Sequence, residues 1–312
     1  MASQTWVTFT CGQSGNMDKN AYRIGEECDR QANMRPGCEV EPHVSFEKRC
    51  LCSMYLVESL IGTGGGGNVY KAWHTRLNKH VVLKEHKLTH PDSKASAHNE
   101  AEALKNVKSM YIPQVFDLFE EEGRCFTVME YVKGTSYEKA LELKMEYTET
   151  DIARWYFQLA STLQTIHEKN ICHCDIKPSN IMLTSSRDVC LIDFNSAMVE
   201  GSPFRVLSCS PGYASPEQLN LFKEHRQGVD ASQSIDWKLS DIYSLGATMY
   251  HMLTRRSPLE NAQRDENLNT SQQFNSVLAS AIEKSMNPDP SDRFESAKQL
   301  LQTLAITKAK IA

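Results

Sequence analysis

The sequence predicts an α+β protein in which a β-sheet with one helix precedes a mostly helical half. Two patterns predict this order. Between Tyr55 and Tyr131 short β-rich runs alternate with Gly and Asn turns, whereas after Gly134 apolar residues recur every three or four positions. The third observation is size: 312 residues, 40% of them hydrophobic and 23% charged, suffice for one large domain or two lobes.

The sheet half begins at Tyr55, after a segment of different composition. Residues 1–52 show no sustained period of 2 or 3.6, so we expect an irregular segment and assign it no role. One helix, from about Lys94 to Val107, interrupts the strands and stops before Pro113. The expected strands are Tyr55–Val57, Val69–Trp73, Val81–Leu83, Gln114–Phe119 and Phe126–Glu130.

The helical half opens with Thr148-x-x-Asp151, which resembles a capping box. Apolar residues between Ile152 and Ile166 then recur at three and four positions, which predicts one long amphipathic helix. Residues 255–275 are polar and predict a surface loop. The other expected elements are short strands at Ile181–Leu183 and Val189–Ile192, and helices near Ile242–Leu253, Gln272–Lys284 and Glu295–Leu304.

Charge and hydropathy exclude several classes of protein. Acidic residues outnumber Lys plus Arg by 39 to 34, so the net charge of -5 offers no bulk attraction to nucleic acid or anionic lipid. No apolar run approaches the roughly 18 residues of a membrane helix, and the opening residues lack the pattern of a signal peptide. We therefore expect a cytoplasmic protein with no nucleic-acid partner and no membrane span in this chain; its oligomeric state stays open.

The ten cysteines are too sparse for a disulfide scaffold. Five lie in or beside apolar runs, where a free thiol acts as a small hydrophobe. The other five precede residue 53, and only two of these are closely spaced. Reduced thiols are the favoured interpretation, and a zinc site is an open alternative. The early cysteines are Cys11, Cys28, Cys38, Cys50 and Cys52.

A glycine-rich segment lies between two of the expected strands. Residues 62–69, GTGGGGNV, fit the pattern G-x-G-x-x-G-x-V, and glycine lets backbone N–H groups approach a polyphosphate without an intervening Cβ. Alone the segment could equally be a flexible turn. No Lys-Ser/Thr pair follows, which excludes a Walker A loop, and the strand that follows disfavours a dinucleotide fold.

The next strand ends in a lysine, Lys84. A strand lysine is usually a solvated edge charge. Here Glu100 follows within the expected helix, where its carboxylate could pair with Lys84 and hold the ammonium group against phosphate oxygens. Glu102 is the second candidate for that partner.

Two motifs in the helical half decide between these interpretations. Residues 173–180 read HCDIKPSN and residues 191–195 read LIDFN. Together with the glycine segment and Lys84, they resemble the Ser/Thr protein kinase family, most closely its bacterial branch. The resemblance runs from about Tyr55 to Leu304, with every block in order.

This resemblance implies a fold and an activity. It implies a two-lobed protein-kinase-like fold, with a small antiparallel-sheet lobe and its one helix at residues 53–132 and a larger helical lobe at residues 133–312. It implies ATP in the cleft, Mg²⁺ as a cofactor and a protein substrate with a Ser or Thr acceptor. The expected activity is transfer of the ATP γ-phosphoryl group to a protein hydroxyl.

The residue types of the two motifs suit this chemistry, because phosphoryl transfer needs positioning and charge neutralisation more than covalent chemistry. Asp175 is the expected catalytic base, and Lys177 would neutralise the transferring phosphate. The side-chain oxygens of Asn180 and Asp193 are ligands suited to Mg²⁺. Singly, each residue could belong to a capped turn, but the joint pattern favours catalysis. With Lys84 and Glu100 they complete the expected catalytic and metal-binding set.

The resemblance also implies a nucleotide pocket. A stripe of Val and Met is ordinarily core, so these assignments follow the alignment of motifs rather than the residue chemistry. The expected nucleotide-binding residues are Gly62, Gly64 and Gly67 of the loop, the walls Val69, Val82 and Met182, Lys84, the gatekeeper Met129, and the hinge residues Glu130 and Val132.

Residues 211–217, PGYASPE, resemble the end of a kinase activation segment. By the same resemblance, Glu217 pairs with Arg293, and Asp241 accepts hydrogen bonds from the backbone of the catalytic loop. These supports separate protein kinases from small-molecule kinases. Lys177, together with Ser210, which is placed like the family's Thr before the segment end, favours a Ser or Thr acceptor over Tyr.

Four positions depart from the family pattern. Cys174 replaces an Arg that usually pairs with a phosphorylated activation segment, so we expect activity that needs no phosphate there. Asn195 replaces a Gly, Ser215 an Ala, and Gly66 an aromatic lid. The departures at Cys174, Asn195 and Gly66 motivate one alternative, a pseudokinase or nucleotide-binding scaffold. A further alternative is a small-molecule phosphotransferase on a kinase-like fold, which Lys177 and the pair of Glu217 and Arg293 disfavour. Whether Cys174 and Asn195 reduce activity stays open.

Overall fold

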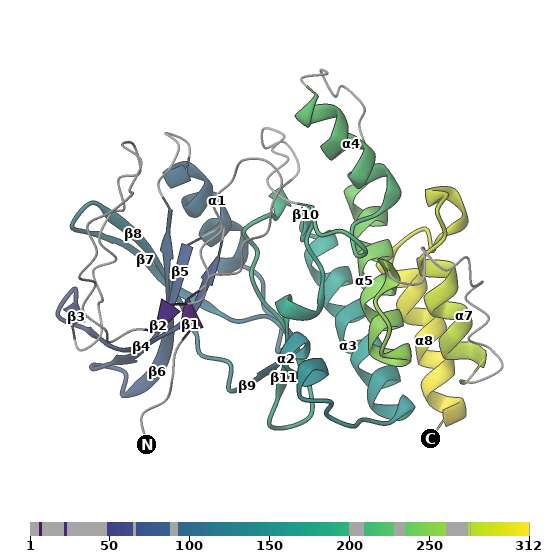
Figure 1. Cartoon of the computed structure of the whole chain (residues 1–312), viewed down its shortest axis with the longest axis horizontal. Coiled ribbons are helices and arrows are strands. Elements are labelled where there is room, and N and C mark those ends of the chain that lie inside the picture. The colour runs from purple at the N-terminus through teal and green to yellow at the C-terminus, as the bar shows by residue number, and fades with distance from the viewer. Residues whose placement is uncertain are drawn as a thin grey trace. The chain divides into compact units, whose positions relative to one another are not determined.

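The computed structural model divides the chain into two units, Met1–Ser45 and Phe46–Ala312 (Figure 1). In the first unit, β1 (Trp6–Val7) pairs antiparallel with β2 (Tyr22–Arg23). Cys11, Cys28 and Cys38 lie outside the described residues, whereas Cys50 and Cys52 are described and carry free thiols. The expected irregularity of residues 1–52 and the zinc alternative stay predictions. The structure describes residues 6–7, 22–23, 49–64, 67–87, 93–199, 209–227, 235–259, 274 and 276–311.

A six-stranded antiparallel sheet forms the small lobe of the second unit, in the order β3-β4-β5-β6-β8-β7. One face of the sheet buries a cluster that includes Tyr55, Leu83 and Phe126, because alternate residues of each strand point to the same side of the sheet. Helix α1 (Ser93–Lys105) packs against β6, β7 and β8. The strands are β3 (Cys50–Leu51), β4 (Tyr55–Gly64), β5 (Gly67–His74), β6 (Lys79–His86), β7 (Val115–Glu121) and β8 (Arg124–Glu130).

Helix α3 (Glu149–His167) is the centre of the large lobe, and it packs against α5 and α8. Thr148 and Asp151 form the predicted capping box at its start. Helix α5 (Trp237–Thr254) begins five residues before the expected Ile242, because the Asp236 side chain accepts from two backbone N–H groups there. The remaining helices are α2 (Tyr137–Glu142), α4 (Pro216–Arg226), α7 (Ser276–Ser285) and α8 (Ala297–Ile311).

Short strands and turns position the residues between these helices. A three-stranded sheet has the order β12-β11-β9, and β10 pairs with β13. Most of the predicted surface loop at residues 255–275 lies outside the described residues. Within the part of the chain that is described, no helix is long and apolar enough to cross a membrane. The elements are β9 (Gly134–Ser136), β10 (Ile171–Cys172), the 3-10 turn η1 (Pro178–Asn180), β11 (Ile181–Thr184), β12 (Val189–Leu191), β13 (Met198–Val199) and η3 (Pro290–Asp292).

Candidate active site

A cavity of about 760 Å³ lies between the sheet lobe and the helical lobe. Its wall contains Lys84 and Glu100 from the small lobe and Asn180 and Asp193 from the large lobe, although these residues are far apart in the sequence. The wall also contains residues that no motif indicated, such as Leu104, Pro113 and Val115. All ten predicted nucleotide-binding residues line it: Gly62, Gly64, Gly67, Val69, Val82, Lys84, Met129, Glu130, Val132 and Met182.

Lys84 is a buried cation and not a solvated edge charge, since its side chain is only 6% exposed. Its Nζ donates to Glu100 Oε1 at 2.8 Å and to Asp193 Oδ1 at 3.1 Å. Glu102, the second candidate partner, instead accepts from Lys105. Burial alone would lower the pKa of Lys84, but Glu100 and Asp193 offset that effect and raise it. The ammonium group therefore stays charged at neutral pH.

Asp193 lies at the turn after β12, with φ of +63°. Asn195, which stands where the family has Gly, does not have a positive φ; at this turn it is Asp193 that adopts the left-handed conformation. Burial raises the pKa of the Asp193 carboxyl, yet the neighbouring Lys84 reverses this and the pKa is lowered overall. Asp193 is thus an anion at the cavity wall.

Asp175 belongs to a second polar group, on the loop between β10 and η1. Ser210 Oγ donates to Asp175 Oδ1 at 2.7 Å, and Lys177 Nζ pairs with Asp175 Oδ2 at 2.8 Å and donates to Ser210 Oγ at 2.9 Å. Asn180 Nδ2 donates to the Asp175 carbonyl at 2.8 Å. These contacts join Asp175 to Asn180, and hence to the cavity wall, and to the segment that resembles an activation segment.

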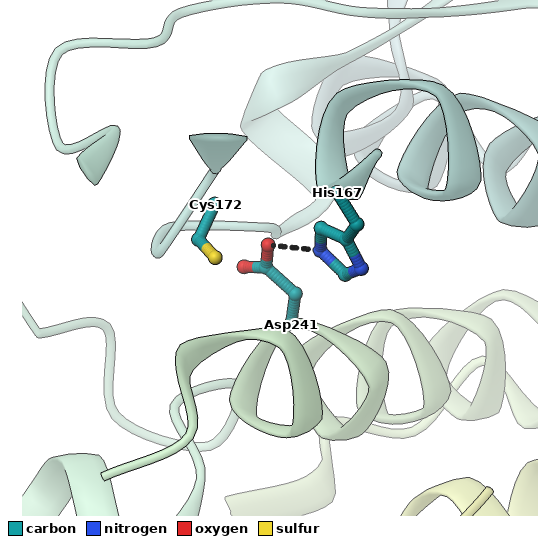
Figure 2. Close-up of side chains that lie close together, drawn as sticks. All are labelled: His167, Cys172 and Asp241. Carbon is teal, nitrogen blue, oxygen red and sulfur yellow. Dashed lines mark hydrogen bonds and ion pairs between the residues drawn. The ribbon is translucent and has the colours of Figure 1, made fainter. Parts of the chain in front are cut away.

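Asp241 on α5 holds the backbone of this loop. Its carboxylate accepts from His173 N and Cys174 N, both at 2.8 Å, which confirms the predicted contact. It also accepts from His167 Nε2 at 2.9 Å, a residue at the end of α3 that no motif indicated. Figure 2 shows His167, Cys172 and Asp241 close together. These residue types can bind metal, but both Asp241 oxygens already accept protein hydrogen bonds, so the cluster serves as a structural support of the loop.

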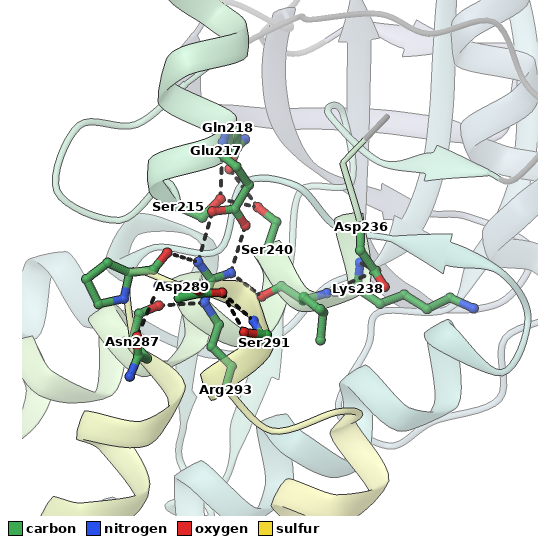
Figure 3. A network of polar contacts seen from close by, with 12 residues as sticks. Ser215, Glu217, Gln218, Asp236, Lys238, Ser240, Asn287, Asp289, Ser291 and Arg293 are labelled. Carbon is green, nitrogen blue, oxygen red and sulfur yellow. Dashed lines mark hydrogen bonds and ion pairs between the residues drawn. The ribbon is translucent and has the colours of Figure 1, made fainter. Parts of the chain in front are cut away.

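The predicted pair of Glu217 and Arg293 is confirmed and bidentate (Figure 3). The Arg293 nitrogens donate to the two Glu217 oxygens at 2.7 and 2.9 Å. Arg293 also donates to the carbonyls of Asn287 and Leu239, and its side chain is fully buried. The pair fixes the start of α4, beside the Ser210 segment, to the helical core.

Three loop glycines can be compared, because Gly65 and Gly66 lie outside the described residues. A Cβ on Gly62 would make ordinary contacts with Val69, and one on Gly64 would meet nothing. Gly67 has φ of +140°, and a Cβ there would lie 1.7 Å from the carbonyl oxygen of Glu85. Only Gly67 of the three requires glycine in this structure.

Comparison with known proteins agrees with this geometry. The family model described as protein kinase domain matches residues 55–310. The chain belongs to the protein kinase family.

This kinase domain is similar to protein kinases from organisms as different as Synechocystis sp. and Mus musculus. It is 30% identical over 277 residues to serine/threonine-protein kinase D of Synechocystis sp., covering 80% of this chain and 51% of that protein. It is 31% identical over 223 residues to serine/threonine-protein kinase pkn3 of Myxococcus xanthus, covering 66% and 38%. With Nek5 of Mus musculus it shares 31% over 207 residues, covering 64% and 31%. The matched region spans about half of these relatives or less.

Proposed function

We propose that this kinase domain transfers the γ-phosphoryl group of ATP to a Ser or Thr hydroxyl of a protein substrate. The observation that carries the proposal is the buried Lys84, bonded to both Glu100 and Asp193 at the wall of the cavity. A cation held between carboxylates of the two lobes is suited to binding phosphate oxygens. Relatives named as serine/threonine kinases support the same reaction.

ATP fits the cavity by the chemistry of its wall. Met129, Val82 and Met182 offer apolar surface for adenine, and the backbone of Glu130 and Val132 offers hydrogen bonds for specificity. The glycine hairpin between β4 and β5 offers N–H groups to the phosphates. Lys84 would bind the same phosphates.

Magnesium fits the donor set of Asn180 and Asp193. Asn180 Nδ2 donates to Asp175, which leaves the amide oxygen as the ligand atom, and the lowered pKa of Asp193 keeps its carboxylate charged. Both are hard oxygen donors, which Mg²⁺ prefers. When bound, the ion would neutralise phosphate charge.

Asp175 is the proposed base. The substrate hydroxyl oxygen forms a bond to the γ-phosphorus, the bond between that phosphorus and the leaving oxygen of ADP breaks, and the hydroxyl proton goes to the Asp175 carboxylate. Lys177 lies 2.8 Å from the same carboxylate and would stabilise the negative charge of the transferring group. Ser210, which donates to Asp175, would orient the carboxylate.

Asp175→Asn tests this function in a transfer assay with ATP, Mg²⁺ and a mixture of Ser- and Thr-containing acceptor proteins. We expect the rate to fall by about 10²–10⁴-fold, because the amide cannot accept the proton. Asp117→Asn, on β7 outside the cavity wall, is the matched control and should leave the rate unchanged. Transfer that does not depend on Asp175 would contradict the proposed base. No transfer at all with the wild-type chain would contradict the proposed function and favour the scaffold alternative.

The predicted independence from activation-segment phosphorylation stays a prediction, since residues 200–208 of that segment, with the candidate acceptors Ser202 and Ser208, lie outside the described residues. Cys174 itself is buried, and its Sγ lies 3.6 Å from the carbonyl oxygen of Cys172. A buried thiol in that position offers no cation to a phosphate.

A further inference from the structure

Cys174, the residue before Asp175, has an unfavourable backbone conformation. Its φ is +63°, in the left-handed region that residues other than glycine rarely adopt. It is also only 6% exposed. Such a conformation persists only where the surrounding structure holds it.

Two helices hold the backbone of Cys174 from opposite ends of the residue. Its N–H donates to Asp241 Oδ1 of α5 at 2.8 Å, and its carbonyl accepts from Gln218 Nε2 of α4 at 2.8 Å. The carbonyl belongs to the peptide group that joins Cys174 to Asp175. Because a peptide group is planar, the bond from Gln218 helps to fix the direction in which the Asp175 side chain leaves the backbone.

Gln218 is itself held in place (Figure 3). It is 4% exposed, its Oε1 accepts from Ser240 Oγ at 3.2 Å, and its backbone N–H donates to Ser215 Oγ at 3.3 Å. The preceding residue, Glu217, is bonded to Arg293. A carboxamide with both ends bonded and no access to water is a rigid donor.

We propose that Gln218 is a positioning residue for the catalytic base. Its hydrogen bond to the Cys174 carbonyl helps to fix the orientation of Asp175, so that the orientation of the base depends on the position of α4. This inference rests on the proposed role of Asp175. Gln218 does not line the cavity, so it acts on the transfer step and not on nucleotide binding.

Gln218→Met tests the proposal, because methionine has a similar length and no donor. We expect kcat to fall on the order of 10-fold, because losing one hydrogen bond that orients a charged group changes a rate by about that factor. KM for ATP should change less than about 2-fold. Ser240→Ala is the milder variant, which removes only the bond that orients the carboxamide and should lower kcat in the same direction.

Gln158→Met is the matched control. Gln158 is likewise buried, 5% exposed, and bridges elements through its carboxamide, which donates to Asp188 and accepts from Val189 N. It does not touch the 172–175 backbone in the described structure. We expect Gln158→Met to lower the free energy of unfolding about as much as Gln218→Met does but to leave kcat unchanged. If Gln218 had only a structural role, the two variants would have the same effect on kcat.

Cys174→Gly tests whether Gln218→Met lowers kcat through the backbone of residue 174 or through a general loss of stability. Glycine adopts a positive φ without strain, so residue 174 would depend less on the bond from Gln218 to hold its conformation. In the Cys174→Gly background, Gln218→Met should lower kcat less than about 3-fold. An undiminished effect in that background, or full kcat in Gln218→Met alone, would overturn the proposal while Asp175-dependent transfer in the wild type leaves the proposed function intact. A wild-type chain without Asp175-dependent transfer would instead refute the proposed function and, with it, this role.

Discussion

Single charged residues of this kinase domain act in pairs across long stretches of sequence. Lys84 meets Asp193, and Glu217 meets Arg293, with one member of each pair almost fully buried. A buried charge without a partner is expensive, so each pair restricts how the elements that carry it can pack. Removing one member of a buried pair lowers the stability of the fold strongly, because the other charge stays buried without a partner. Replacing both members by apolar residues of similar size has a much smaller effect on stability.

Glu217→Gln should destabilise the fold by about 3–5 kcal/mol at pH 7, because it leaves the Arg293 guanidinium buried without its carboxylate. Burial raises the pKa of Glu217, but the bonds from Arg293 offset this and lower the pKa below its ordinary 4.5. A lowered pKa means that the stabilisation is present above 4.5 and is lost as the pH falls through the folded-state pKa. Urea unfolding from pH 7 down to pH 3.5 should show the difference between wild type and variant shrinking at acidic pH. A difference that does not change with pH would contradict this assignment.

At the scale of elements, the shape of the hairpin of β4 and β5 in the cavity wall depends on Gly67. The strands pair from Tyr55 with His74 to Gly64 with Gly67. Gly67 is also paired with His86 of β6, so a side chain at Gly67 would push on the next strand.

Gly67→Ala should raise KM for ATP by on the order of 10-fold, since its Cβ must displace the Glu85 carbonyl and the hairpin with it. Gly64→Ala is the control: it enters open space at a φ that any residue tolerates and should leave KM within about 2-fold. Steady-state kinetics with varied ATP would measure both. Equal effects of the two substitutions would show that loop mobility, and not the close approach at Gly67, controls nucleotide binding.

At the scale of the whole kinase domain, the buried hydrophobic residues that the structure describes form two separate clusters, one within the six-stranded sheet and one around α3. The residues proposed to bind ATP and Mg²⁺ come from both lobes. Lys84 and Glu100 belong to the sheet lobe, and Asn180 and Asp193 belong to the helical lobe. A nucleotide that contacts both lobes should therefore stabilise both together.

ATP with Mg²⁺, added at about 100 times its Kd, should stabilise the native state by about 2.7 kcal/mol and raise Tm by about 5–10 °C. EDTA should remove most of the shift, because the metal ligands would lose their ion. Lys84→Met should abolish it, since the phosphates lose a cation. Lys71→Met is the control, a lysine of the neighbouring strand that pairs with Glu58 and does not line the cavity. Differential scanning calorimetry would measure the shifts, and an equal shift in Lys84→Met would contradict the proposed site.

The sequence by itself determined the order of strands and helices, the family, and the pairs of Lys84 with Glu100 and of Glu217 with Arg293. Periodicity, capping residues and motif spacing are local properties, and the family motifs carry the distant pairs with them. Only the tertiary structure decided that Gly67 alone of the three described loop glycines requires its residue type, and that His167 and Gln218 support the loop before Asp175. Such contacts depend on how helices pack across tens of residues, and a side chain bonded to a backbone group leaves no pattern in the sequence of either partner.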